Sequence, residues 1–411
     1  MNNYPQDWDS KLLGNVFPKI VVGYVGNVND HYCSESEGVA FYRTLNIRDG
    51  YFRHNDLKYV THAFNDKNKK SQISNNDILI ARVGANLGMV CKATGINCLA
   101  NMANAIIIKT NSNRTADADF FTYFLLSPMG KNQIFSGAAG GAQGVFNTKL
   151  THEIRVPTPP LSEQRKIAKI LSTWDKAISS TERLINNSKQ QKKALMQQLL
   201  TGKKRLLDES GKPFEGEFDR VNLSELATID KSSLGKKTPE DFEFSYISLS
   251  DVETGKISDN LEKHIYSSSP SRARRKVSNG DILLATVRPN LKGFAKVKAE
   301  HDGMIASTGF SVLNPKKDVA GDYLYHYLFS CHITGQINAL VVGSNYPAIN
   351  SSDVSGLKVY IPCYDEQKKV AKVLNNADES LAQLEQQLAG LKQEKKALMQ
   401  QLLTGKKRVI I

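Results

Sequence analysis

Apolar residues recur at alternating spacings of three and four in two long segments of the chain. The first stripe comprises Ile167, Leu171, Trp174, Ile178, Ile185, Leu195 and Leu199. The second comprises Val370, Leu374, Ala377, Leu381, Leu384, Leu388, Leu391, Leu398 and Leu402. This heptad spacing predicts two long helices whose apolar faces pair with each other. Burial at about 1.5 kcal/mol per side chain outweighs surface ion pairs of about 0–1 kcal/mol, so the stripes should hold the pair together.

Both segments carry helix start and stop signals. Ser162 and Asp365 are good N-cap residues after a proline-containing segment, and a Thr-Gly pair closes each segment. The interval of about 40 residues corresponds to roughly 60 Å of helix. Lys192 and Lys395 fall on the apolar stripes, so we expect the coiled coil to open near them.

The two segments are copies of one internal repeat. Residues 159–205 return as residues 362–408 without a gap, and 25 of the 47 aligned positions are identical. A repeat with one fixed offset predicts a protein of two similar halves.

Identity within the repeat is uneven. Between residues 176 and 188 only Glu182 matches its counterpart, whereas all 14 residues from Lys192 to Arg205 recur unchanged. A helical seam needs only its leucines, so the identical polar residues predict a docking surface that is presented twice, to two copies of one partner. The candidate docking residues are Lys193, Gln197, Gln198, Lys396, Gln400 and Gln401.

Connectivity favours an antiparallel helix pair. Each helix follows a globular segment, so an antiparallel pair brings the end of the first helix beside the start of the second. A parallel pair would force the chain back along the helices. The sequence therefore predicts two globular domains separated by a stiff two-helix spacer, with an internal pseudo-two-fold and a nearly circular arrangement.

The two globular segments repeat one order of elements. In the first, apolar runs predict strands at Ile78–Val83, Met89–Lys92, Ala105–Ile108 and Ile154–Val156, and a helix near Asp117–Leu126. Residues 76–81 match 280–285, which predicts two small α+β domains of one fold. The predicted division is 1–158 for domain 1, 159–205 for the first helix, 206–361 for domain 2 and 362–411 for the second helix.

The net charge of +13 is concentrated in the helical segments. Residues 159–205 carry +8 and residues 362–411 carry +3, whereas residues 206–361 carry −2. A basic total is typical of nucleic-acid binding. In domain 2, however, any DNA-binding face must be a local patch.

Several function classes lack their motifs. No run of 18 apolar residues and no signal peptide are present, so we expect a soluble cytoplasmic protein. The five cysteines have no CxxC spacing, which argues against a zinc site or a disulfide framework. The glycine-rich stretch 137–144 lacks the Lys-Ser/Thr of a P-loop, and no HExxH or Gly-x-Ser-x-Gly occurs. We therefore expect the chain to have no catalytic residues of its own.

Polar and basic residues in turns are the candidate DNA contacts. Arginine to guanine and asparagine to adenine are the bidentate base contacts that geometry favours. Corresponding turns after a buried strand contain Arg82 with Asn86 in domain 1, and Arg288 with Asn290 and Lys292 in domain 2. A solvent-exposed turn is the alternative interpretation of each.

Three further groups are candidates for DNA contacts. The first is Arg272, Arg274 and Arg275, which we expect in a loop after a serine run, as phosphate contacts or as a solvated charge cluster. The second is Gln143 with Asn147, at the end of the glycine-rich stretch, which is either a flexible loop or a loop whose backbone approaches DNA. The third is its counterpart in domain 2, Asn345 with Tyr346.

These residues carry a family resemblance that spans the whole chain. Pro-Pro-Leu-Ser-Glu-Gln-Arg-Lys-Ile-Ala at 159–168, a long helix ending in Leu-Leu-Thr-Gly-Lys-Lys-Arg, and a second copy of both resemble the specificity subunit of type I restriction-modification systems. The duplicated Glu-Gln pairs at 163–164 and 366–367 are its most specific part. Domain 2 departs from the family's glycine-glutamine turn, having Ser-Asn-Tyr-Pro-Ala-Ile-Asn at 344–350.

The resemblance implies a function. Each globular domain would be a target recognition domain for one half of a split, asymmetric site in double-stranded DNA. The paired helices would set the spacer and dock two methyltransferase (M) subunits, which two ATP-driven restriction (R) subunits join. S-adenosylmethionine, ATP and magnesium would belong to those partners, with no cofactor in this chain. The alternative is a coiled-coil protein scaffold without specific DNA binding.

Overall fold

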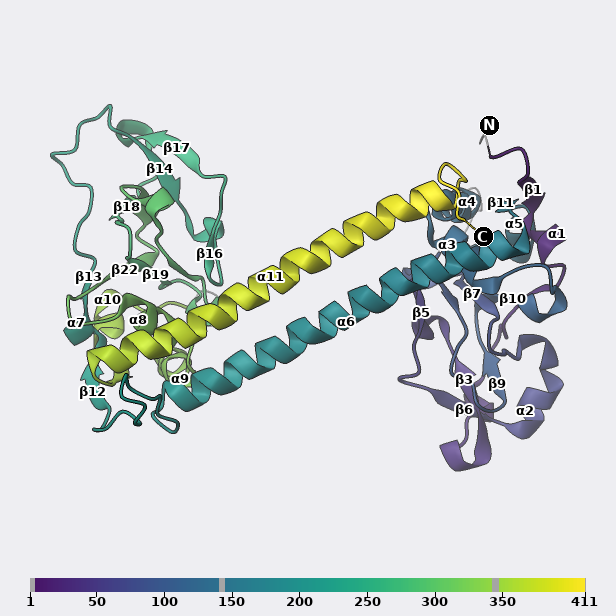
Figure 1. Cartoon of the computed structure of the whole chain (residues 1–411), viewed down its shortest axis with the longest axis horizontal. Helices are drawn as coiled ribbons and strands as arrows, with labels where there is room; N and C mark the ends of the chain where they lie inside the picture. Colours follow the sequence, from purple (N-terminus) through teal and green to yellow (C-terminus); the bar gives the residue numbers. More distant parts are fainter. Residues whose placement is uncertain (1–3, 140–144, 342–346, 411) are drawn as a thin grey trace. The chain divides into compact units, whose positions relative to one another are not determined.

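The computed structural model describes residues 4–139, 145–341 and 347–410. Contacts divide the chain into two compact units. Unit 1 comprises Met1–Glu182 and Gln387–Ile411, and unit 2 comprises Arg183–Gln386. Each unit therefore combines a globular domain with one part of each long helix, which Figure 1 shows in teal (α6) and yellow (α11).

Unit 1 is built on a buried antiparallel sheet. Its strands, in spatial order, are β2 (Ile20–Val22), β10 (Ala105–Ile108), β7 (Ile78–Ala81) and β8 (Val90–Lys92). A second sheet has the order β6 (Lys58–Thr61), β3 (Gly38–Tyr42) and β9 (Ala100–Met102). Two strand pairs complete the domain, β1 (Asp9–Leu12) with β11 (Arg155–Thr158) and β4 (Ile47–Arg48) with β5 (Tyr51–Phe52).

The helices of this domain are short. They are α1 (Leu13–Val16), α2 (His62–Lys67), α3 (Ala118–Leu126), α4 (Pro128–Ala139) and α5 (Thr148–His152). The side chain of Asp117 caps α3 by accepting the amide of Phe120 at 2.9 Å. The predicted strands and the predicted helix near Asp117–Leu126 are thus confirmed.

Unit 2 repeats this plan and adds a strand. Its first sheet has the order β13 (Ala227–Ile229), β22 (Phe310–Pro315), β19 (Ile282–Ala285) and β20 (Phe294–Lys296). Its second sheet has the order β17 (Glu262–Ile265), β14 (Glu243–Ile247), β21 (Ile305–Ser307) and β18 (Ala273–Lys276). The strand pairs are β12 (Asp219–Asn222) with β23 (Lys358–Ile361) and β15 (Val252–Glu253) with β16 (Lys256–Ile257).

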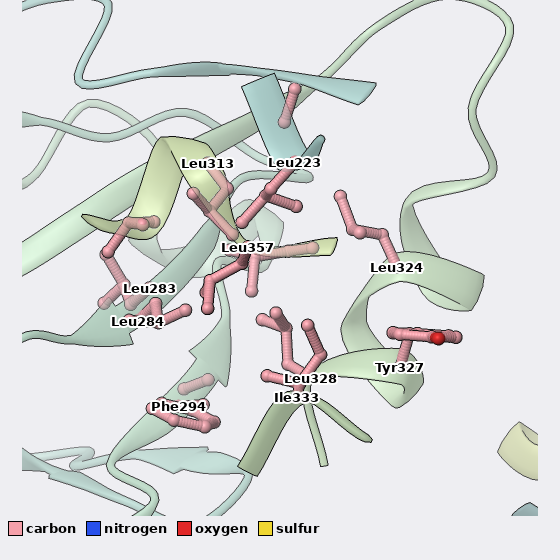
Figure 2. Packing of buried hydrophobic residues seen from close by; sticks show 14 of the residues in the cluster. Leu223, Leu283, Leu284, Phe294, Leu313, Leu324, Tyr327, Leu328, Ile333 and Leu357 are labelled. Carbon is pink, nitrogen blue, oxygen red and sulfur yellow. The ribbon is translucent and has the colours of Figure 1, made fainter. Parts of the chain in front are cut away.

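The core of domain 2 lies between its first sheet and its helices. These helices are α7 (Leu223–Leu226), α8 (Gly321–Leu328), α9 (Cys331–Leu340) and α10 (Ser351–Gly356). Figure 2 shows Leu283 and Leu284 of β19 within the same apolar cluster as Leu324 of α8 and Ile333 of α9. Burial of both faces of the central strand explains its continuous apolar run, and the same holds for β7.

The long helices begin earlier than the capping residues predict. Helix α6 spans Leu161–Leu199 and helix α11 spans Tyr364–Leu402. The carbonyl of Pro160 already accepts the amide of Gln164 at 3.0 Å, which is a helical hydrogen bond. Ser162 and Asp365 therefore lie inside the first turn, and the prediction that they are N-caps is wrong.

Ion pairs fix the direction of the two helices within each unit. In unit 1 the pairs are Glu163–Arg408 (2.7 Å), Asp175–Lys395 (2.5 Å) and Glu182–Lys392 (2.7 Å). In unit 2 they are Glu366–Arg205 (2.7 Å), Asp378–Lys192 and Glu385–Lys189 (2.8 Å). As residue numbers rise along one helix they fall along the other, so the helices run antiparallel, as predicted. Every pair of unit 1 has its equivalent in unit 2 at the repeat offset.

Lys192 and Lys395 do not open the helix pair. Each is half-buried and bonded to an aspartate of the opposite helix. A lysine can bury its aliphatic stem along an apolar seam while its ammonium group reaches a carboxylate. The predicted opening is therefore wrong. The sequence did not reveal the partner aspartates, because they lie far from the lysines along the chain.

The duplicated Glu-Gln pair joins three parts of each unit. The buried carboxylate of Glu163 accepts hydrogen bonds from Arg408 at 2.7 and 2.9 Å and from the Trp8 indole at 3.0 Å. The Gln164 side chain accepts the amide of Asp117 at 2.8 Å, which ties the helix to the start of α3. The most specific motif in the sequence is therefore a structural clamp.

Unit 2 contains the same clamp. Arg205 donates to the buried carboxylate of Glu366 at 2.7, 2.9 and 3.2 Å. Gln367 accepts the amide of Ala320, the residue before α8, at 2.9 Å.

Candidate nucleic-acid interface

In each domain the chain makes a turn as it leaves the buried central strand. In domain 1 the turn follows β7 and contains a short 3₁₀ helix, Gly84–Asn86. In domain 2 it follows β19 and contains the 3₁₀ helix Pro289–Leu291. Both turns lie at the same end of equivalent strands, so the fold presents the two sets of turn residues in the same way.

A second candidate segment lies against each turn. In domain 1 the amide of Phe146 donates to the carbonyl of Arg82 at 3.1 Å. In domain 2 the amide of Arg288 donates to the carbonyl of Pro347 at 2.7 Å, and the amide of Ile349 to that of Thr286 at 2.9 Å. The structure thus brings together segments about 60 residues apart in sequence, a proximity that the sequence analysis did not predict.

The predicted residues of the domain 1 turn are partly engaged within the protein. Arg82 is half-buried, and its Nε atom is buried without a hydrogen-bond partner among the described residues. The amide group of Asn86 donates to the carbonyl of Thr44 at 3.2 Å. Asn86 therefore also stabilises the turn.

Asn147 has a structural role at this site. Its side-chain oxygen accepts the amide of Leu150 at 3.0 Å and caps α5. Asn350, its counterpart, caps α10 by accepting the amide of Asp353 at 2.9 Å. The oxygen of Asn147 is thus engaged in the cap, and its NH₂ group is the donor that it can offer to a base.

The domain 2 turn is more exposed and more basic. Arg288 and Asn290 are exposed and Lys292 is half-buried. Leu291, which the sequence analysis missed, is 66% exposed between them. Nothing in its sequence context marks it, because its exposure follows from the geometry of the turn.

The basic cluster of domain 2 lies on a strand, not in a loop as predicted. Arg274 and Arg275 belong to β18, where pairing with β21 holds the backbone extended. Arg275 forms an ion pair with Asp230 at 2.8 Å, and the guanidinium of Arg274 lies over the ring of Tyr266. Arg272 precedes the strand and is exposed.

Three of the candidate DNA contacts, Gln143, Asn345 and Tyr346, lie outside the described residues. The described residues that follow these positions, Phe146 and Pro347, make the hydrogen bonds to the two turns given above.

The predicted docking residues are exposed in both units. The identical stretch divides into residues that the fold uses and residues that it does not. Leu199 and Leu200 belong to the core of unit 2 and Leu402 and Leu403 to that of unit 1. The six predicted docking residues, Lys193, Gln197, Gln198, Lys396, Gln400 and Gln401, are all exposed.

At one pair of equivalent positions the two domains contact the helices through different groups. In unit 1 the hydroxyl of Tyr123 donates to Asp175 at 2.7 Å, and burial followed by this carboxylate raises the pKa of the phenol. In unit 2 the position is His326, whose Nε2 lies 2.7 Å from the side-chain oxygen of Asn375. Burial lowers the pKa of His326.

The described residues contain no group of three or more His, Cys, Asp and Glu side chains that could hold a metal ion. Among the same residues, no helix is long and apolar enough to cross a membrane.

Comparison with known proteins gives a consistent family. The family model for the type I restriction modification DNA specificity domain matches residues 5–190 and 215–393. The chain is 24% identical to the type I restriction enzyme MjaVIII specificity subunit of Methanocaldococcus jannaschii, covering 98% of this chain and 94% of that protein. It is also 24% identical to the EcoKI specificity subunit of Escherichia coli, covering 80% and 73%.

A solved structure has the same fold. The crystal structure of the type I restriction-modification S subunit from M. genitalium matches with a TM-score of 0.59 at 16% identity, covering 98% of this chain and 97% of that one.

Proposed function

The chain belongs to the type I restriction modification DNA specificity family, and from this premise we propose that each of its domains recognises one half of a bipartite, asymmetric site in double-stranded DNA. The observation that carries the proposal is the duplicated turn. In both domains polar residues follow a buried strand, and backbone hydrogen bonds hold their turn to a second segment. Rigid support of this kind is what base recognition requires.

The candidate contacts are those predicted from the sequence. In domain 1 they are Arg82, Asn86, Gln143 and Asn147. In domain 2 they are Arg272, Arg274, Arg275, Arg288, Asn290, Lys292, Asn345 and Tyr346. Exposure supports the turn of domain 2 most strongly, whereas Arg275 is engaged by Asp230 and would contribute less.

We propose that the two long helices set the spacer between the half-sites. Each is an uninterrupted helix of 39 residues, or about 58 Å at 1.5 Å per residue. Buried leucines and repeated ion pairs stabilise their pairing within each unit, which supports a stiff spacer.

The exposed repeated residues support docking of two M subunits. Because the same side chains recur at the repeat offset on equivalent helix surfaces, one partner can bind twice in the same way. Two R subunits would join this assembly. The chain itself would be non-catalytic, and S-adenosylmethionine, ATP and magnesium would bind to the partner subunits.

The test is to express the chain with its M subunits and to map methylated positions genome-wide. We expect a complex with two M subunits that methylates a bipartite site with a fixed gap. Methylation of one continuous short site would contradict the two-domain proposal, and a chain that binds M subunits but no specific DNA would support the scaffold alternative.

A further inference from the structure

The domain 2 turn holds two cationic residues in an unusual backbone conformation. Arg288 has φ 49° and ψ 50°, and Lys292 has φ 54° and ψ 42°, so both are left-handed. They bracket the 3₁₀ helix Pro289–Leu291. Residues with a Cβ rarely adopt this conformation because the Cβ approaches the following carbonyl.

The equivalent positions of domain 1 are glycines. With β7 aligned to β19 at an offset of 204 residues, Arg288 corresponds to Gly84 (φ 74°) and Lys292 to Gly88 (φ 80°). The turn therefore requires a left-handed backbone at both positions in both domains. Domain 1 satisfies this requirement with the residue that adopts it without strain, and domain 2 does so with two cations.

Backbone hydrogen bonds hold the turn in this conformation. Its backbone is fixed by hydrogen bonds from the amide of Arg288 to the Pro347 carbonyl (2.7 Å) and from that of Lys292 to the Pro289 carbonyl (2.9 Å). The Thr254 hydroxyl donates to the carbonyl of Lys292 at 3.2 Å. Strained residues on a rigidly held turn cluster at functional sites, where the side chain is used.

We propose that Arg288 contacts a guanine edge and Lys292 a phosphate in the DNA half-site bound by domain 2. The planar fork of arginine matches the O6 and N7 acceptors of guanine, whereas lysine acts as a point charge that suits a phosphate. Domain 1, with glycines at these positions, contacts its half-site differently. This inference rests on the proposed function and assigns part of its specificity to one turn.

Glycine substitution separates a functional role from a structural one. Arg288→Gly and Lys292→Gly each place glycine where the backbone is already left-handed, so the thermal unfolding midpoint should stay equal or rise. Arg288→Lys keeps a charge at the same strained position. As a control we choose Lys317→Ala, because Lys317 is exposed and follows β22, whose pairing with β19 places it beyond the opposite end of that strand.

The measurement is DNA affinity of the complex with its M subunits, over a range of salt, together with the methylation pattern. We expect Arg288→Gly to lower affinity for the wild-type site about tenfold and to relax preference at one base pair of one half-site. Arg288→Lys should relax that preference with a smaller loss of affinity. Lys292→Gly should weaken binding to all sequences alike and lower the salt slope by about 1.

Two results would overturn the inference. One is wild-type affinity and methylation in both glycine variants. The other is a loss of DNA affinity in the glycine variants that is no larger than the loss in Lys317→Ala. A wild-type complex without a bipartite site would instead contradict the proposed function, so the two failures are distinguishable.

Discussion

Replacement of Arg205 by alanine tests the clamp at the start of α11. The change removes three hydrogen bonds to Glu366 and leaves a carboxylate whose side chain is only 1% exposed. Removal of one partner of a buried ion pair costs about 3–5 kcal/mol, because the other charge stays buried without compensation. Arg205 itself is 21% exposed, so water can partly reach the site and we expect the lower end, about 3 kcal/mol.

Urea unfolding gives the measurement. With a slope of about 3 kcal/mol per molar urea, which suits a unit of this size, the midpoint of unit 2 should fall by about 1 M. Both tryptophans, Trp8 and Trp174, belong to unit 1, so tryptophan fluorescence follows unit 1 while hydrogen exchange follows the amides of unit 2. We expect Arg205→Ala to shift only the unfolding midpoint of unit 2, as followed by hydrogen exchange.

Two variants sharpen this test. Arg408→Ala is the matched change in unit 1, where Arg408 is 43% exposed and Glu163 keeps its bond from the Trp8 indole, so the loss should be smaller. The double variant Arg205→Met with Glu366→Leu removes both charges and should be more stable than Arg205→Ala. An unchanged unit 2 midpoint in Arg205→Ala would refute the clamp, as would a double variant that is less stable than the single one.

Three further predictions follow from the helices. Burial lowers the pKa of His326 below that of an unfolded histidine (about 6.5), so unfolded unit 2 binds more protons than folded unit 2. The stability of unit 2 should therefore be complete above pH 6.5 and fall as the pH drops below it. His326→Tyr, which copies unit 1, should remove this dependence when melting is measured at a series of pH values. A triple variant, Lys193→Ala with Gln197→Ala and Gln198→Ala, removes one docking surface. The matched variant carries Lys396→Ala, Gln400→Ala and Gln401→Ala. Each should reduce the mass of the purified complex by one M subunit without changing the melting midpoint. Deletion of seven residues from each helix, 179–185 and 382–388, keeps the heptad phase and shortens the helix pair by about 10 Å. The preferred DNA gap should therefore shrink by about three base pairs. An unchanged gap in the methylation pattern would contradict the spacer role.

Local pattern determined the architecture of this protein. The heptad stripes of 159–205 and 362–408, their repetition at one offset and the apolar runs of β7 and β19 are visible in the sequence, because helix and strand periodicity depends on neighbouring residues. Connectivity then gave the antiparallel direction of the helices. The exposed positions of the docking residues also followed from the repeat, since a seam needs only its apolar members.

Only the tertiary structure decided which side chains meet. Lys192 and Lys395 lie on the apolar seam, and the sequence predicts that they disrupt it. In the structure each is bonded to an aspartate, 186 and 220 residues away respectively. The sequence predicts a loop for Arg274 and Arg275, because no local pattern indicates that this segment pairs with β21. Arg288 and Lys292 are left-handed in a turn whose backbone is bonded to Pro347, and the equivalent turn of domain 1 has Gly84 and Gly88 at these positions. Contacts between residues distant in the chain fix these features, and their free energy is not encoded in any short window of sequence.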